Sequence, residues 1–131
     1  MSIRVVHPPG FPEPKGYADG IVCDGPTLFI SGQVGWNEKG AFPSSFVDQF
    51  AQALDNVKAV MAEAGARANG LVRMTIYVTD LDSYRSNLKE IGGVWRKRFD
   101  RHFPAMALVG VTGLVHPDAL VEIEATASVS A

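Results

Sequence analysis

The sequence predicts an α+β fold in which two helices cover one face of a mixed sheet. Three observations predict it: apolar residues recur at helical spacing over residues 46–64, they alternate with polar ones over 71–79, and the closing stretch 102–127 contains two apolar strands. The last strand carries Glu122 and Glu124. Because strand side chains alternate, both carboxylates lie on one face and the apolar residues on the other. The full order is β-β-α-β-α-β-β.

Length and composition limit the class of protein. A chain of 131 residues, 47% hydrophobic and 20% charged, fits a single globular domain spanning residues 1–131. A net charge of −2 gives no basic surplus for nucleic acid, and one cysteine with three scattered histidines offers no metal-ligand spacing. No run approaches roughly 20 apolar residues, and the N-terminus lacks a signal-peptide pattern. We therefore expect a cytoplasmic protein without a membrane span, a metal, a cofactor or a nucleic-acid partner.

The first third of the chain predicts short strands. Residues 3–6 can form an edge strand, and a proline-rich irregular segment follows it. Residues 20–23 and 27–31 predict a hairpin, because Asp-Gly lies between two apolar runs. Glycines 32 and 35 at the end of the second strand indicate a bulge, or a place where another group approaches the backbone closely.

The first helix has recognisable ends. Ser45 can cap it, and Asp48 follows three residues later as in a capping box. Phe50 and the apolar residues at helical spacing from it form the core face, whereas polar residues including Gln49 fill the opposite face. Gly65 is expected to end the helix.

The second half predicts a sheet with one uncovered face. A strand over 71–79 precedes a second helix that begins at Asp80 or Asp82 and continues to Phe99. Two helices can cover only one face of a sheet of about five or six strands. The other face mixes apolar, hydroxyl and charged side chains, as protein–protein interfaces do. We therefore expect a homo-oligomer. The residues expected on this face include Leu71, Arg73, Thr75, Tyr77, Glu122, Glu124 and Ser128.

Several stretches in this order and spacing resemble the YjgF/RidA family of reactive-imine deaminases. The likeness covers the chain from about Tyr17 onward. The stretches are Tyr17, the Ser-Gly-Gln run at 31–33, ALDNVKAVMAEAG at 53–65, VRMTIYVTDL at 72–81, PAMALVGV at 104–111 and ALVEIEATA at 119–127.

The resemblance implies a chorismate-mutase-like fold of the bacillary type, assembled as a homotrimer with ligand clefts between neighbouring subunits. It implies hydrolysis of a 2-imino or 2-amino-2-enoic acid to a 2-keto acid and ammonium, without a cofactor. Glu122 matches the acid that positions the attacking water. The substrate-binding residues expected in the cleft are Tyr17, Ser31, Gly32, Met106, Ala107 and Leu108.

The chain departs from the family pattern within this cleft. Met106 occupies the position of the arginine that holds the substrate carboxylate, Leu108 that of a frequent cysteine, and Gly92 that of a common asparagine. Methionine offers no donor to a carboxylate. If that anchor contributed about 3 kcal/mol to substrate binding, its loss would lower the rate or the affinity more than a hundredfold. Met106 is therefore either a simple pocket wall or a sign of specificity for a larger, less anionic ligand.

Alternatives stay open for the other residues and for the function. Glu122 is a general base or an interface carboxylate. Tyr17 caps the cleft or is an ordinary interface residue, and Ser31 with Gly32 binds ligand or ends a strand. Arg73 or His102 is a candidate to replace the missing arginine. The alternatives to a deaminase are a non-catalytic metabolite-binding trimer and, more remotely, the endoribonuclease or translation inhibitor named for some relatives.

Overall fold

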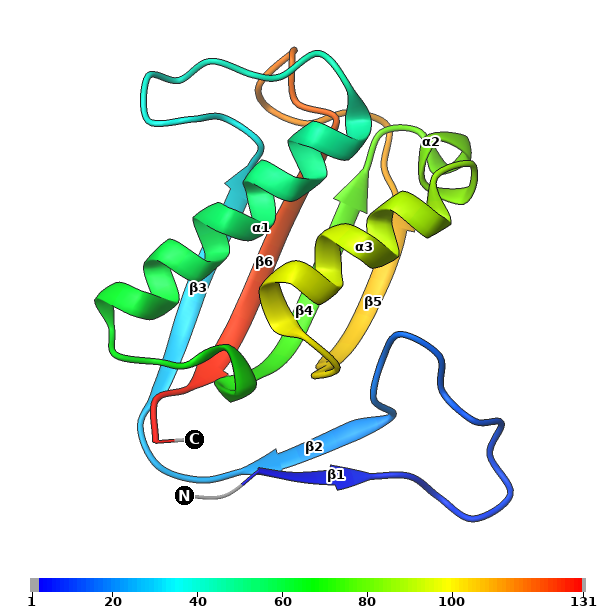
Figure 1. Cartoon of the computed structure of the whole chain (residues 1–131), viewed down its shortest axis with the longest axis vertical. Helices are drawn as coiled ribbons and strands as arrows, with labels where there is room; N and C mark the ends of the chain where they lie inside the picture. The colour runs from blue at the N-terminus through cyan, green and yellow to red at the C-terminus, as the bar shows by residue number, and fades with distance from the viewer. Residues whose placement is uncertain (1–2, 131) are drawn as a thin grey trace.

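Two helices lie across one face of a four-stranded mixed sheet in the computed structural model, which describes residues 3–130 (Figure 1). The remaining residues of the domain expected over 1–131 lie outside the described part. In the strand order β3-β6-β4-β5, β4 and β5 are parallel and the other pairs antiparallel. The α+β architecture is therefore confirmed. The elements are β3 (Thr27–Val34), β6 (Val121–Ser128), β4 (Leu71–Val78), β5 (Ala105–Gly110), α1 (Phe46–Glu63) and α3 (Leu88–Phe99).

The expected hairpin between residues 20–23 and 27–31 is wrong. β2 (Gly20–Cys23) pairs instead with β1 (Ile3–Val6) in a separate two-stranded sheet below the main one (Figure 1). The turn between β2 and β3 contains Pro26, so it is not the two-residue turn that closes a hairpin. The Pro26 carbonyl accepts a hydrogen bond from the Val129 backbone instead (3.0 Å). The β1–β2 arm therefore leaves the main sheet.

One short contact returns the arm to the main sheet. Ala18 forms an isolated parallel bridge with Ala105, and its backbone N–H donates to the Pro104 carbonyl (2.9 Å). This contact fixes the preceding residue, Tyr17, beside the start of β5.

The first helix follows its expected boundaries. The Ser45 hydroxyl accepts a hydrogen bond from the Asp48 backbone (3.1 Å), and Gly65 adopts a φ of 81° just after the helix ends. The expected solvent position of Gln49 is wrong, because this side chain is only 2% exposed. Two loops cover this part of the helix, and the Gln49 amide bonds to both of them.

The second half differs from the expectation in three details. The helix expected from Asp80 onward is broken into α2 (Leu81–Arg85) and α3, and a 3₁₀ turn (Ala68–Gly70) precedes β4. Leu71 is fully buried rather than on the uncovered face, because the β4–β6 register shifts between Leu71 and Arg73. Ser128 is buried too, and its hydroxyl donates to the Asp24 carbonyl (3.2 Å).

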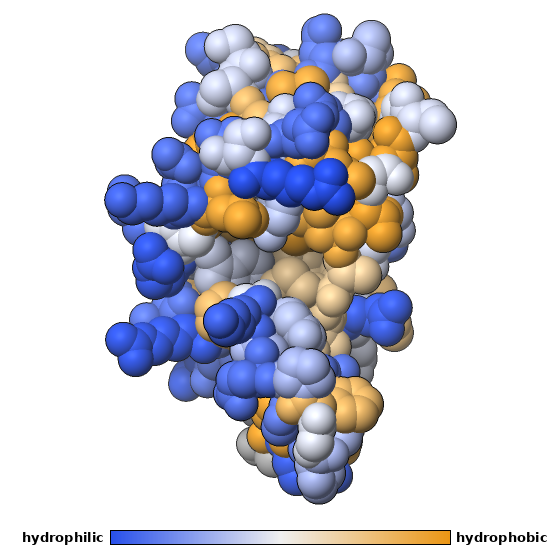
Figure 2. Space-filling view, turned by 90° about the vertical axis from the view of Figure 1, so that its right-hand side faces the viewer, coloured by the Kyte–Doolittle hydropathy of each residue, from blue (hydrophilic) through white to orange (hydrophobic). Residues whose placement is uncertain are grey.

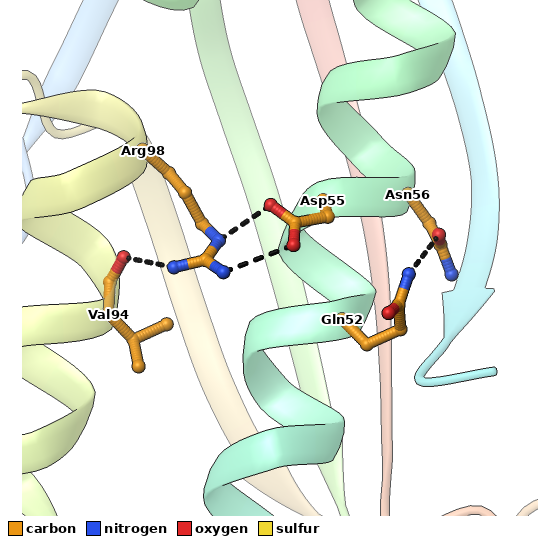
Figure 3. Close-up of polar contacts among 5 residues, drawn as sticks. All are labelled: Gln52, Asp55, Asn56, Val94 and Arg98. Carbon is orange, nitrogen blue, oxygen red and sulfur yellow. Dashed lines mark hydrogen bonds and ion pairs between the residues drawn. The ribbon is translucent and has the colours of Figure 1, made fainter. Parts of the chain in front are cut away.

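The two long helices are tied together by polar side chains as well as by the core. Arg98 donates to both carboxylate oxygens of Asp55 (2.7 and 3.1 Å) and to the Val94 carbonyl (3.0 Å), as Figure 3 shows. On the other side of α1, Gln52 donates to Asn56 (3.0 Å). Across residues 3–130, no helix is both long enough and apolar enough to cross a membrane.

Candidate functional site

The sheet separates the expected site residues onto its two faces. Met106 is in register with Met74 on the face that the helices cover, whereas Glu122 is opposite Tyr77 on the uncovered face. The two positions are two strands apart and three residues apart along the strand direction. Strand spacing and rise therefore put their Cα atoms about 14 Å apart. One chain does not bring Met106 and Glu122 to the same ligand.

Glu122 lies directly over Gly32 on the uncovered face. A side chain at Gly32 would place its Cβ 2.8 Å from Cδ of Glu122 and 3.0 Å from Cγ, with Oε2 closer still. The β3–β6 register shifts between Ile30 and Gln33, which confirms the bulge expected at the glycine. Glu122 is half-buried and makes no hydrogen bond or ion pair with any residue in the range 3–130. The glycine thus leaves room for a carboxylate that is free to hold water.

The neighbouring carboxylate has a structural role. The Tyr77 hydroxyl donates a hydrogen bond to Oε1 of Glu124. This hydrogen bond raises the pKa of Tyr77 above its ordinary value of 10.0, and the negative charges of Glu124 and Glu122 raise it further. Glu124 is therefore engaged across the sheet, while Glu122 is not.

A first hollow, the Tyr17 hollow, lies where residues 17–19 meet β5. It has a volume of about 260 Å³, and Tyr17, Asp19, Arg73, Met106 and Ala107 line it. Oδ2 of Asp19 lies 2.6 Å from Nδ1 of His7. Sequence reasoning missed this pair because it joins two points of an irregular segment with no periodicity to reveal it.

A second hollow, the open-face hollow, lies on the uncovered side of the sheet and has a volume of about 460 Å³. Phe29, which is 79% exposed, lies at one side of it, with Tyr77 and Glu124 also in its lining. Arg73 and Ala107 line both hollows, and Arg73 makes no ion pair with a residue that the structure describes. Its guanidinium is the only cation lining either hollow in the described chain, so it remains the candidate anchor for an anion.

Five expected site residues line neither hollow: Glu122 and Gly32, which lie against each other on the uncovered face, and Ser31, Leu108 and His102. Ser31 is exposed and its hydroxyl and carbonyl oxygens accept hydrogen bonds from Gln33 Nε2 (3.3 and 3.2 Å). Leu108 packs against the core from the helix-covered face. His102 lies with Nε2 2.6 Å from the Leu71 carbonyl, beside a different hollow of about 590 Å³. Within residues 3–130, no three histidine, cysteine or acidic side chains are placed to hold a metal ion.

The fold and these hollows define a small α+β domain whose candidate ligand site lies along the edge and the uncovered face of its sheet. The family model described as Endoribonuclease L-PSP matches residues 12–129. The chain belongs to this family, the YjgF/RidA family, as its sequence pattern predicts.

Curated relatives and solved structures agree with this assignment. A RutC family protein of Aquifex aeolicus is 36% identical over 129 residues, which cover 95% of this chain and 98% of the relative. A 2-iminobutanoate/2-iminopropanoate deaminase of Dermatophagoides farinae is 32% identical over 92% of each chain. Among solved structures, the Rid family protein YyfB of Yersinia pestis has a TM-score of 0.85 at 33% identity, covering 98% of this chain and 99% of its own. The Escherichia coli YjgF gene product has a TM-score of 0.69 at 34% identity, covering 86% of this chain and 87% of its own.

Proposed function

We propose that the protein hydrolyses an imine or enamine metabolite other than the small 2-imino acids, in clefts between the subunits of a homotrimer. The observation that carries the proposal is the unpaired carboxylate of Glu122, held over Gly32 on an uncovered sheet face. One relative named a 2-iminobutanoate/2-iminopropanoate deaminase and another named a putative reactive intermediate deaminase support the reaction class.

The chemistry needs one general base and no cofactor. Glu122 accepts a proton from a water molecule as that water adds to the carbon of the C=N bond. Glu122 returns this proton to the nitrogen of the tetrahedral adduct. The C–N bond then breaks as the hydroxyl group passes its proton to the departing nitrogen and becomes C=O, so ammonia leaves, or ammonium where the imine entered protonated. An enamine enters the same route after a proton from water adds to its β-carbon and gives the protonated imine.

The separation of Glu122 from Met106 supports an assembled site. At about 14 Å apart and on opposite faces of the sheet, the two cannot contact one small ligand within one chain. A second copy that contributes its Glu122 to the Tyr17 hollow of the first would unite them. The same contact would cover Phe29 and the mixed polar surface beside it.

Methionine at position 106 supports a substrate other than the small 2-imino acids. Met106 offers no donor at the position of the missing guanidinium, and Arg73, which lines the same hollow, is on the opposite face of the sheet from Met106. A small 2-imino acid would therefore lose a bidentate anchor that contributes about 3 kcal/mol, a factor above one hundred in rate or affinity. A larger ligand with less negative charge depends less on that anchor.

Ammonia release from 2-iminopropanoate and from bulkier neutral enamines tests the proposal. We expect turnover of a bulky substrate and at least a hundredfold loss in Glu122→Gln, with Glu124→Gln as the matched control two residues further along the same face. Met106→Arg should raise the rate on 2-iminopropanoate. The deaminase assignment fails if no substrate is hydrolysed and Met106→Arg restores none, or if both glutamine variants keep full activity.

The loss of the arginine also favours one alternative, a trimer that binds a metabolite without chemistry. A ligand recovered unchanged, together with an affinity that Glu122→Gln leaves intact, would identify that function.

A further inference from the structure

A separate apolar cavity of about 180 Å³, the α3 cavity, lies between α3 and the sheet. Four aromatic rings form much of its wall: Phe50, Tyr84, Trp95 and Phe103. Trp95 and Phe103 are stacked, with ring centroids 5.8 Å apart and planes 10° from parallel. Figure 2 faces this side of the molecule and shows apolar surface gathered around a recess midway down it.

At Gly92, helix α3 contributes bare backbone to the wall of the cavity. Gly92 lines the cavity, and a Cβ added there would meet only the end of the flexible Arg96 side chain, at 3.3 Å. Leu88, one turn earlier, also lines the cavity and is 56% exposed, so the space opens to the surface at this turn. Protein interiors rarely leave voids of this size unfilled. An opening of this kind suits a ligand better than a packed core.

The size and chemistry of the lining limit what can enter. An engineered apolar cavity of about 150 Å³ binds benzene, so a single ring fits here. No charged side chain is in the lining of the α3 cavity itself, and the nearest cation, the Arg96 guanidinium, lies 3.3 Å from a Cβ added at Gly92 in the cavity wall. A carboxylate within the cavity would therefore lose its hydration. The indole N–H of Trp95 already donates to the His102 carbonyl (3.0 Å), whereas the Tyr84 hydroxyl has no hydrogen-bond partner among residues 3–130. Burial raises the pKa of Tyr84, which keeps this hydroxyl a neutral donor.

Met106 joins this cavity to the candidate reaction site. Met106 lines both the α3 cavity and the Tyr17 hollow. Of two consecutive residues, Gly16 lines the α3 cavity and Tyr17 lines the Tyr17 hollow. We propose that the α3 cavity binds an uncharged, ring-sized apolar group of the ligand, with the Tyr84 hydroxyl donating to an acceptor on that group. That the ligand is a substrate rests on the proposed function; the binding of its ring does not.

Calorimetric titration of the full-length protein with p-cresol, toluene and benzoate tests the inference. We expect p-cresol to bind at least tenfold more tightly than benzoate, since the two share a ring and differ in charge. Gly92→Leu should weaken p-cresol binding at least tenfold, because a leucine there fills or covers the opening. Gly93→Leu is the matched control: Gly93 does not line the cavity and a Cβ there has open space. Tyr84→Phe should weaken p-cresol a few-fold and leave toluene unchanged.

The outcomes separate this inference from the proposed function. No p-cresol binding, equal effects of the two leucine variants, or benzoate binding as tightly as p-cresol would each overturn the ring site. If p-cresol binds and Gly92→Leu abolishes it while the wild type hydrolyses no imine, the ring site stands and the hydrolase proposal falls. If the wild type hydrolyses imines without binding p-cresol and without preferring ring-bearing substrates, the hydrolase proposal stands and the ring site falls.

Discussion

Alanine at Gly35 should destabilise the fold through a backbone collision. Gly35 follows β3 where α1 crosses it, and an added Cβ would lie 2.7 Å from the Cα and 2.8 Å from the Cβ of Gln49, with the Gln49 carbonyl oxygen closer still. Ordinary carbon contacts are about 3.5–4.0 Å, so the overlap approaches 1 Å against a helix backbone. The helix or the strand must move, which places Gly35→Ala at the upper end of overpacking costs, about 3 kcal/mol.

Alanine at Gly32 creates an overlap of similar size but meets a different obstacle. Here the added Cβ would approach Cδ and Cγ of Glu122, at 2.8 and 3.0 Å, and a carboxylate side chain can rotate away. We expect less than about 1 kcal/mol of destabilisation, comparable to an off-rotamer side chain. The displaced carboxylate would no longer hold its water. Imine hydrolysis should therefore fall by about a hundredfold or more, the usual contribution of a general base.

Urea unfolding at one fixed protein concentration, together with an ammonia-release assay, separates the two effects. With a slope of about 2 kcal/mol per molar, 3 kcal/mol lowers the midpoint for Gly35→Ala by about 1.5 M. The midpoint of Gly32→Ala should move by less than about 0.5 M. Equal destabilisation of the two variants would refute the geometric reasoning. A Gly32→Ala protein with full hydrolytic activity would refute the role given to Glu122.

Three further outcomes follow from the same structure. Gln49→Leu leaves two loop carbonyls and one backbone N–H without their hydrogen-bond partners at 2.8–3.0 Å. Thermal unfolding should show that the free energy of unfolding falls by about 2–4 kcal/mol. The control Gln52→Leu removes one hydrogen bond within α1 and should lower it by less than about 1 kcal/mol. The pKa of Tyr77 is raised in the native state, so the hydrogen bond of its protonated hydroxyl stabilises that state fully below pH 10.0. This stabilisation is lost as the pH rises through the higher native pKa. Tyr77→Phe should remove a late step from the phenolate absorbance titration, and an unchanged titration would contradict the assignment. Combining Met106→Arg with Gly92→Asn should raise the rate on 2-iminopropanoate by more than the product of the single changes, because both positions line one cavity; strictly independent effects would count against that coupling.

Local patterns in the sequence were sufficient for most of the fold. Ser45 and the apolar spacing after it defined α1, and alternation defined the β4 and β6 strands, because both signals act within a few residues. The predicted hairpin was wrong for a local and a non-local reason: Pro26 lies in its turn, and residues 20–23 pair with β1, far away along the chain, instead of β3. The expected solvent exposure of Gln49 was wrong for a similar reason, because the residues that cover it lie six and about seventy positions away along the chain.

The candidate site was less predictable than the fold. Glu122 and Gly32 were expected in one cleft and do lie together, because a cross-strand register brings them into contact. Met106 and Glu122 were both expected in clefts between neighbouring subunits; within one chain, they lie apart on opposite faces of the sheet. Net charge also does not show how charges are distributed. Arg67, Arg96, Lys97, Arg98 and Arg101 line one hollow at the end of α3 together with Asp100, and Arg98 is paired with Asp55.

Two departures from the family pattern that are distant in the sequence are neighbours in the fold. Met106 replaces the expected arginine and Gly92 an expected asparagine, and both residues line the α3 cavity. A guanidinium and an amide at these positions would introduce polar groups into the space that a thioether and a bare backbone now leave apolar. Losing only the guanidinium at position 106 would leave the amide at position 92 as a polar group without a partner. Losing only the amide would leave a void beside the charged guanidinium. Both outcomes are unfavourable. The proposed function and the proposed ring site together imply that the two substitutions act as one change in ligand chemistry, from anchoring a carboxylate to accepting an uncharged ring.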